Sequence, residues 1–279
     1  MAIELVEKYL PYVDEQFSTE SKISLLTNQD FKFVGAHTVR VYKISTSEMN
    51  DYGRAGAAEG NWSRYGVVAN LDATTEHFEL QNDRSFTFVI DTLDEEETGD
   101  TLEAASALAR QNREVVIPEV DNYVYGVMCE NAGSKPAAIE LTAENIYTEI
   151  IKATNALDNA EVPIDSRVLV VTPDTYLLMK QCKEIVMETD IGNDMRIRGV
   201  IGNLDGLSVQ KIPPKRLPVD FGFMVVHPCA TVAPTKLESF KTHADPPGIS
   251  GTLVEGRIVY GAYVLGNKAK AIYYQRKTV

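Results

Sequence analysis

The sequence predicts an α+β fold, and three stretches of the 279-residue chain carry this prediction. Residues 85–130 have the pattern of a strand, an acidic turn and a long helix. Residues 167–181 combine a continuous apolar run with a helix start, as in an α/β unit. Residues 252–274 alternate like two long strands on either side of Gly266 and Asn267, a two-residue hairpin signal.

The first of these stretches contains the clearest strand and the longest helix. Phe86, Phe88 and Ile90 alternate with Thr and Val, which predicts a strand with one apolar face. Asp100 and Glu103 have the spacing of a helix cap, because the second side chain can return to the amide of the first. We therefore expect a helix to start near Asp100 and to form the backbone of the fold.

The same helix contains a proline and an apolar stripe. Pro118 should kink the helix or begin its second half, because proline lacks an amide hydrogen and crowds the preceding turn. Apolar residues at helical spacing predict a face that must be buried. These residues are Val116, Val120, Tyr123, Val124 and Val127.

A long polar excursion separates two predicted strands in the first third of the chain. Residues 31–44 alternate like a strand, with Val39, Val41 and Ile44 facing a core, and we expect them to pair with residues 85–91. The residues between are either a mobile surface excursion or a two-stranded arm. An isolated hairpin is only marginally stable in water, so a long arm needs a neighbour, such as another subunit.

The second half of the chain predicts a compact α/β unit. Thr142 is expected to cap a helix, and Thr172 with Pro173 should start another helix directly after the strand at residues 167–173. A tight turn is expected at residues 203–206, where Asp and Gly interrupt an apolar strand pattern.

Composition places the chain among globular proteins and excludes several classes of function. It is 44% hydrophobic and 24% charged, and its net charge of −13 argues against a groove that wraps nucleic acid. The sequence has neither the apolar run of a membrane span nor the basic start of a signal peptide. Cys129, Cys182 and Cys229 are odd in number and lie far apart, which favours a reducing compartment over a disulfide framework. Cys129 and Cys182 fall in predicted helices and are expected to be small apolar core residues.

The sequence contains no compact motif that binds phosphate or zinc or that activates a nucleophile. Residues 94–97 are all acidic, but they lack the alternating donors and glycine of a calcium loop, so we favour a charge cluster at a helix start. We expect no catalytic residue, no metal and no cofactor. An enzyme with its site in residues 136–245 stays an alternative if converging polar groups line a pocket there.

The order of these elements resembles the major capsid protein family of tailed bacteriophages, which has the Hong Kong 97 fold. The resemblance covers essentially the whole chain. It is carried by SFTFVIDTLDEEET with the helix through PEVDNYVY, the VPIDSRVLVVTP step, IGNLDGLSV, and the late APTKLESF and RIVYGAYVL.

The resemblance implies an N-terminal arm, an extended β-hairpin loop, a long spine helix, a peripheral domain and an axial α/β domain. The implied boundaries are residues 1–34 for the arm and first strand, 35–91 for the extended loop with its base strands, 92–135 for the spine helix of the peripheral domain, 136–245 for the axial domain, and 246–279 for the closing strands of the peripheral domain.

The resemblance also implies a function. Such chains form the hexamers and pentamers of an icosahedral phage head that encloses double-stranded DNA, and they assemble in the host cytoplasm. Expected partners are other copies of the chain, a scaffolding protein, a portal and a decoration protein, with only weak contact to the packaged DNA. The scaffold is expected to be separate, because only about thirty residues precede the first strand if the chain is complete. The alternative is an encapsulin-like compartment that encloses enzymes.

Noncovalent subunit contacts are expected in two places. No lysine occurs between Lys43 and Lys135, so a covalent crosslink through the extended loop is not supported. Arginine can hold a carboxylate of an adjacent subunit with two hydrogen bonds. The expected interface residues are Arg54, Trp62 and Arg64 in the loop, and Glu95, Glu96 and Glu97 in the acidic turn.

Overall fold

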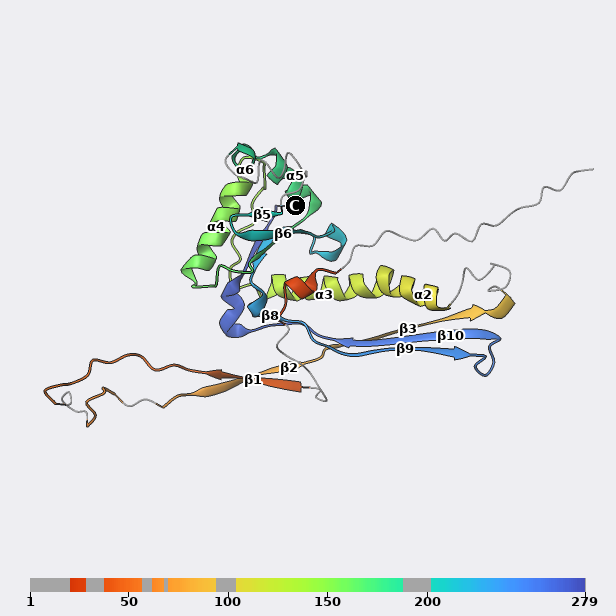
Figure 1. Ribbon diagram of the computed structural model, residues 1–279, viewed down its shortest axis with the longest axis horizontal. Coiled ribbons are helices and arrows are strands. Elements are labelled where there is room, and N and C mark those ends of the chain that lie inside the picture. Colours follow the sequence, from red (N-terminus) through yellow and green to blue (C-terminus); the bar gives the residue numbers. More distant parts are fainter. Residues whose placement is uncertain are drawn as a thin grey trace, which may run out of the picture. The chain divides into compact units, whose positions relative to one another are not determined.

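The computed structural model describes residues 21–28, 38–56, 62–67, 70–93, 104–187 and 202–278. The chain divides into two compact units, one formed by Gly35–Glu79 and the other by Met1–Val34 together with Leu80–Val279 (Figure 1). Most of the predicted N-terminal arm, the acidic residues Glu95, Glu96 and Glu97, and the predicted cap at Asp100 lie outside the described residues.

The smaller unit is a two-stranded antiparallel ribbon. Strand β1 (Thr38–Ile44) pairs with β2 (Ala73–Glu79) in a register that runs from Thr38 opposite Glu79 to Ile44 opposite Ala73. The stretch is therefore two-stranded where residues 73–79 pair with residues 38–44, and no strand is assigned in the described residues 45–56 and 62–67. The expected pairing of residues 31–44 with residues 85–91 is wrong for the described residues, because residues 38–44 pair with β2 and residues 85–91 pair with β10 (Gly251–Tyr260).

The larger unit contains a three-stranded antiparallel sheet in the order β3-β10-β9. Its strands are β3 (Asn82–Asp91), β10 (Gly251–Tyr260) and β9 (Thr235–Ala244). Phe86, Gly256 and Phe240 lie side by side across the sheet. A Cβ atom on Gly256 would lie 2.3 Å from the Phe86 ring, so a side chain at this position would require the phenylalanine to shift.

The predicted long helix is present in three segments. Helix α2 (Ala104–Gln111) continues through a π-helical turn, η2 (Asn112–Val116), into α3 (Ile117–Glu130). Pro118 lies in the first turn of α3, which confirms that it begins the second half of the helix. Proline cannot donate the usual backbone hydrogen bond, and the π turn directly before it accommodates the missing bond.

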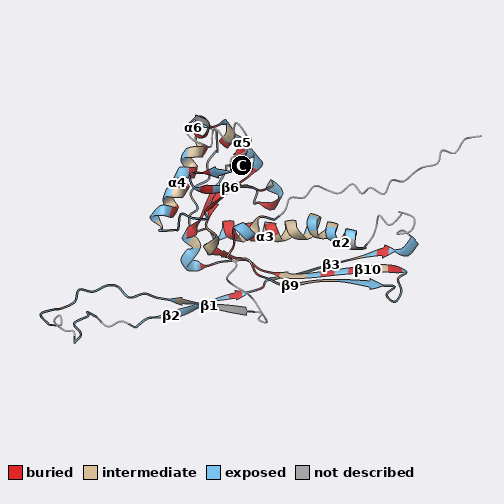
Figure 2. Ribbon diagram, in the orientation of Figure 1, coloured by how far each residue is buried: buried red, intermediate tan, exposed pale blue. Residues whose placement is uncertain are grey.

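Helix α3 is buried on a wider face than the sequence predicts. Val124 of the predicted stripe is fully buried, whereas Val116, Val120, Tyr123 and Val127 are only partly buried. The helix contacts the three-stranded sheet through Tyr123 and Tyr260, whose rings are 5.5 Å apart, and packs a second face against a five-stranded sheet. Tyr125, Met128 and Cys129 are buried in this second contact, and Asp121 is buried on the same helix; Figure 2 shows buried positions along α3.

The five-stranded sheet has the order β12-β7-β4-β6-β5. Strands β4 and β6 are parallel, and the other neighbours are antiparallel. One face packs against α3, and the other against α4 and α5. The strands are β4 (Val168–Val171), β5 (Asn203–Leu204), β6 (Leu207–Lys211), β7 (Phe221–Val226) and β12 (Ile272–Arg276), and the helices are α4 (Ile146–Asn159), α5 (Pro173–Gln181) and α6 (Lys183–Met187).

The remaining described elements are short. They are η1 (Ile23–Leu25), η3 (Pro214–Arg216), η4 (Pro228–Ala230), β8 (Thr231–Val232), β11 (Tyr263–Val264) and η5 (Gly266–Ala271). The hairpin expected at Gly266 and Asn267 is wrong, because a 3-10 helix occupies these residues and β12 pairs with β7 instead of β10. Residues Ile272 to Tyr274 are all buried, and the five-stranded sheet is the core that buries them.

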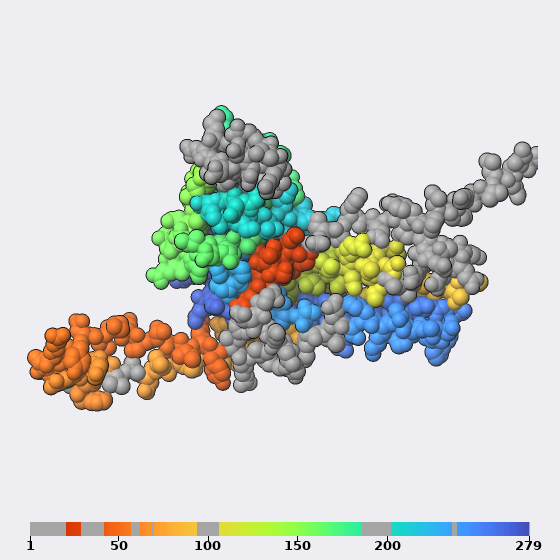
Figure 3. All heavy atoms as spheres, viewed as in Figure 1, coloured from red at the N-terminus to blue at the C-terminus, as the bar shows by residue number. Residues whose placement is uncertain are grey.

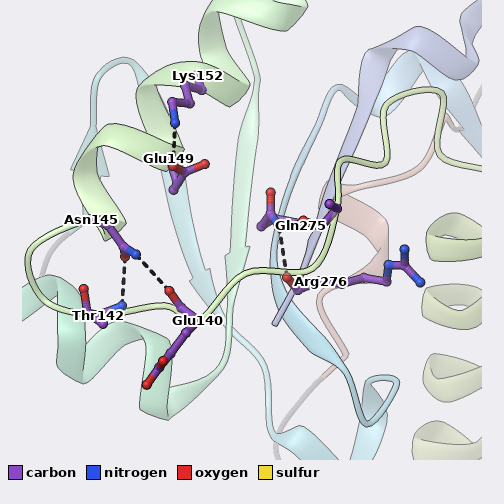
Figure 4. A network of polar contacts seen from close by, with 8 residues as sticks. Glu140, Thr142, Asn145, Glu149, Lys152, Gln275 and Arg276 are labelled. Atoms are coloured by element: carbon purple, nitrogen blue, oxygen red, sulfur yellow. Dashed lines mark hydrogen bonds and ion pairs between the residues drawn. The ribbon is translucent and has the colours of Figure 1, made fainter. Parts of the chain in front are cut away.

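The local helix and turn signals had mixed outcomes. The Thr172 hydroxyl accepts a hydrogen bond from the Thr175 amide, 3.2 Å away, so this cap is confirmed. Asp205 and Gly206 adopt φ angles of 50° and 74°, which confirms the tight turn. The Thr142 cap is wrong: α4 begins at Ile146, and the Thr142 amide instead donates to the Asn145 side chain, 2.8 Å away (Figure 4).

Candidate assembly surfaces

The Gly35–Glu79 unit carries an unusual amount of exposed apolar surface. Among the described residues, sixteen large hydrophobic side chains are exposed, and eight of them lie in this small unit. They are Tyr42, Ile44, Met49, Tyr52, Trp62, Tyr65, Val67 and Leu71. Clustered exposed apolar residues mark interaction surfaces, whereas scattered single ones need no explanation.

The paired strands explain why this surface stays open. Tyr42 and Ile44 lie two residues apart in β1 and therefore share one face of the ribbon, which has no third strand among the described residues. Ile44 is 62% exposed, so the expectation that it faces a core is wrong. On the other face, Lys43 and Glu76 form an ion pair of 3.3 Å. Two strands alone provide no second layer of side chains to cover this face.

The end of the excursion has a defined local structure that presents three of the predicted interface residues. The Gly53 amide donates to the Arg64 carbonyl, 2.9 Å away, and brings the two arms together. The rings of Tyr52 and Tyr65 then meet edge to face, with centroids 5.0 Å apart. Trp62 is 85% exposed. Arg54 and Arg64 are exposed in the same structure, and neither forms an ion pair with a described residue.

Sequence reasoning missed the aromatic pair at this end. Tyr52 and Tyr65 are thirteen positions apart, and only the pairing of the two arms brings them together. The available signal was the pair of glycines, Gly53 and Gly66, that flank the contact. Gly66 has a φ angle of 95°, which favours glycine, and its backbone lies against the Asn50 side chain.

A second surface lies on the outer face of the three-stranded sheet. A depression of about 600 Å³ is lined by the hydroxyls of Ser85, Thr87 and Ser239 and by charged side chains. Arg257 donates two hydrogen bonds to the Asp83 carboxylate here, one from Nε at 2.8 Å and one from Nη2. Hydrogen bonding by Arg257 lowers the pKa of Asp83 below its usual range. This surface is polar and already internally paired.

The larger unit contains little that suggests chemistry. Among the described residues, no group of three or more His, Cys, Asp or Glu side chains is placed to hold a metal ion. All three cysteines are free, and burial is the main cause that raises the pKa of Cys129 to about 12. Its thiol is therefore neutral and unreactive. No helix in the described part of the chain is long and apolar enough to span a bilayer.

The strand order and helices described above are those of the Hong Kong 97 fold, the class of structural capsid subunits. The family described as phage capsid protein matches residues 80–275, most of the chain. The chain therefore belongs to the phage capsid protein family, and its role is that of a structural virion protein. No curated protein matches the sequence.

Solved capsid structures are similar over nearly the whole chain. The structure from Mycobacterium phage Che8 has 18% identity and a TM-score of 0.78, and the match covers 97% of this chain and 96% of the other. The capsid of cyanophage P-SCSP1u has 12% identity and a TM-score of 0.78, with 98% and 93% covered. The mature capsid of bacteriophage PhiM1 has 14% identity and a TM-score of 0.73, with 100% and 92% covered. The expected fold is thus confirmed.

Proposed function

We propose that copies of this chain assemble as hexamers and pentamers into a closed icosahedral head that encloses double-stranded DNA. In this proposal, residues 35–79 bury their apolar side chains on neighbouring copies. The observation that carries it is the concentration of half of the described exposed large hydrophobic side chains in that one unit. Such a surface is costly for a protein that stays alone in water.

Repetition makes modest contacts sufficient. Burial contributes roughly 25 cal/mol per Å² of apolar area, so a few side chains per subunit supply only a few kcal/mol. A closed shell repeats the same contact around every neighbour, and linked contacts gain strength from one another. Weak individual contacts also let misplaced subunits leave before closure.

The charged residues of the excursion supply orientation in this proposal. Arg54 and Arg64 grip carboxylates of an adjacent copy, and Trp62 is buried between them. Their exposure and the absence of an ion partner among the described residues support this role. Glu95, Glu96 and Glu97 remain proposed interface residues on the basis of their charge alone.

The net charge of −13 supports a container that does not hold its DNA tightly. We propose no catalytic step and no cofactor for this chain. The further proposed partners are a separate scaffolding protein, a portal and a decoration protein, with assembly in the host cytoplasm.

Electron microscopy of the purified protein, alone and with DNA-packaging components of the phage, tests the proposal directly. Closed particles are expected from the wild-type chain, and fewer or less heat-stable particles from Trp62→Ala. The matched control is Val219→Ala, which removes a side chain that is 84% exposed in the larger unit. A sample that stays monomeric under all assembly conditions would contradict the proposal. Equal particle yields from all three proteins would contradict the role of Trp62 only.

An encapsulin-like compartment is the second candidate. A virus-like particle from Pyrococcus furiosus matches with 12% identity and a TM-score of 0.56, covering 92% of each chain. The content of particles from the native source separates the two functions. DNA supports the phage head, and a protein cargo without DNA supports the compartment.

A further inference from the structure

A single buried carboxylate joins two segments that are far apart in the sequence. Asp121 lies in α3 and is 2% exposed. Its Oδ2 accepts a hydrogen bond from Arg216 Nη1 at 2.6 Å, and its Oδ1 accepts one from the Ser21 hydroxyl at 2.7 Å. The two partners therefore share one acid, and each uses its own oxygen.

The first partner belongs to a short docked segment, residues 21–28, which we call the amino-terminal strap (red in Figure 3). Leu26 is fully buried in the core beside α3. The Asn28 amide donates to the Thr231 carbonyl, 2.7 Å away. These bonds hold the two ends of the strap, one at Ser21 and one at Asn28. The bond from the Ser21 hydroxyl to Asp121 can therefore form only while the strap is docked.

The second partner belongs to the connection that follows β6 of the five-stranded sheet. Arg216 ends η3 and is 5% exposed. A guanidinium at this depth depends on its carboxylate, because an unpaired buried charge is strongly unfavourable. Two backbone hydrogen bonds close this turn: the Arg216 amide donates to the Pro213 carbonyl, and the Leu217 amide donates to the Pro214 carbonyl. A change in the bond between Asp121 and Arg216 should therefore alter the hydrogen exchange of these two amides.

A further hydroxyl, that of Tyr125, lies one helical turn from Asp121 and donates to none of the described residues. Tyr125 follows Asp121 by one helical turn, so the two side chains are neighbours on α3. The Tyr125 hydroxyl is buried and has no hydrogen-bond partner among the described residues. Burial raises the pKa of Tyr125 above its usual range, and the charge of Asp121 raises it further. A buried hydroxyl without a partner is unfavourable, which makes it a ready replacement donor.

We propose that Asp121 is a two-position switch that couples the strap to the η3 turn. When the strap is docked, Oδ1 accepts the Ser21 hydroxyl, and when the strap leaves, Oδ1 accepts the Tyr125 hydroxyl. The carboxylate moves toward Tyr125 in the second state and alters its bond to Arg216. A neighbouring copy or an assembly factor that displaces the strap would thereby alter the η3 turn, which follows β6 of the five-stranded sheet. The switch belongs to the single subunit and does not depend on the proposed shell.

Hydrogen exchange of the full-length, unassembled chain tests the coupling. Ser21→Ala is expected to raise exchange in residues 21–28 roughly tenfold, since it removes a hydrogen bond to a charged group. It should also raise exchange at the amides of Arg216 and Leu217. The control Ser24→Ala removes an exposed hydroxyl from the same strap and should leave both sites unchanged. Faster strap exchange with unchanged Arg216 and Leu217 amides would overturn the coupling.

Tyr125→Phe tests the replacement donor while preserving the shape of the core. The released state then loses its hydrogen bond, so strap exchange should become several-fold slower than in the wild type. Unchanged or faster exchange of the strap would overturn the role of Tyr125. Melting temperatures of each variant identify a general loss of folding, which would speed exchange everywhere and would also contradict the expected slowing.

Discussion

The two units of this chain differ in how far they bury their apolar side chains. Residues Leu80–Val279 contain two apolar clusters, one on each face of the five-stranded sheet. The described part of the Gly35–Glu79 unit has one strand pair, and most of its large apolar side chains are exposed. The family match begins at residue 80 and leaves the ribbon outside it. The difference indicates that the larger unit buries its apolar side chains within one chain, and it supports the proposal that the Gly35–Glu79 unit buries its own on neighbouring copies.

The largest effect on the isolated subunit is expected in the core. Phe223 lies in β7, is fully buried and stacks on Tyr273 with ring centroids 6.3 Å apart. Phe223→Ala should lower the free energy of unfolding by about 3–5 kcal/mol, because it removes burial and leaves a cavity. Denaturant unfolding of the unassembled chain measures this. A loss below that of an ordinary surface variant would show that this sheet is not the stabilising core.

A smaller loss is expected where the three-stranded sheet is too tight for a methyl group. Gly256→Ala places a Cβ against Phe86 and close to Phe240. Overpacking of this kind should lower the free energy of unfolding by about 1–3 kcal/mol. Gly202→Ala is the matched control, since a Cβ there meets no atom within 4 Å. Equal stability of the two variants would mean that the phenylalanines move aside freely.

The pH dependence of the larger unit should contain a contribution from His227. Burial is the main cause that lowers its pKa below the ordinary value of 6.5, and its Nδ1 accepts from the Cys229 amide. Below pH 6.5 the unfolded chain binds a proton that the folded chain resists, so stability is lost as pH falls from there through the lowered pKa. His227→Asn retains an acceptor and should flatten the dependence of the melting temperature between neutral pH and pH 5. An identical slope in both proteins would exclude His227 as the cause.

The smallest effect on the isolated subunit is expected in the ribbon. Trp62→Ala should change the free energy of unfolding by less than about 0.5 kcal/mol, because its side chain is 85% exposed. The same substitution should lower the melting temperature of assembled particles. Arg54→Ala combined with Arg64→Ala should act in the same direction. A large loss of subunit stability from Trp62→Ala would mean that the ribbon is buried on its own chain.

Much of the local structure could be predicted, and the reason is visible in particular residues. Phe86, Phe88 and Ile90 mark one face of β3, and Pro118 begins α3, as the pattern indicates. Among the interface predictions, Arg54, Trp62 and Arg64 are described and exposed, but what they bind stays a prediction. Ile44 was misplaced because it lies an odd number of positions from Val39 and Val41, and strand residues share a face only at even spacing.

The sequence by itself determined local features such as the Thr172 cap and the Asp205-Gly206 turn, since each depends only on residues close by. Only the tertiary structure decided which strands pair and which polar groups meet. Strand β12 joins β7 and not β10, and Asp121 finds Arg216 across 95 positions. Such choices depend on the burial achieved by the whole chain, and no short window of sequence contains that sum.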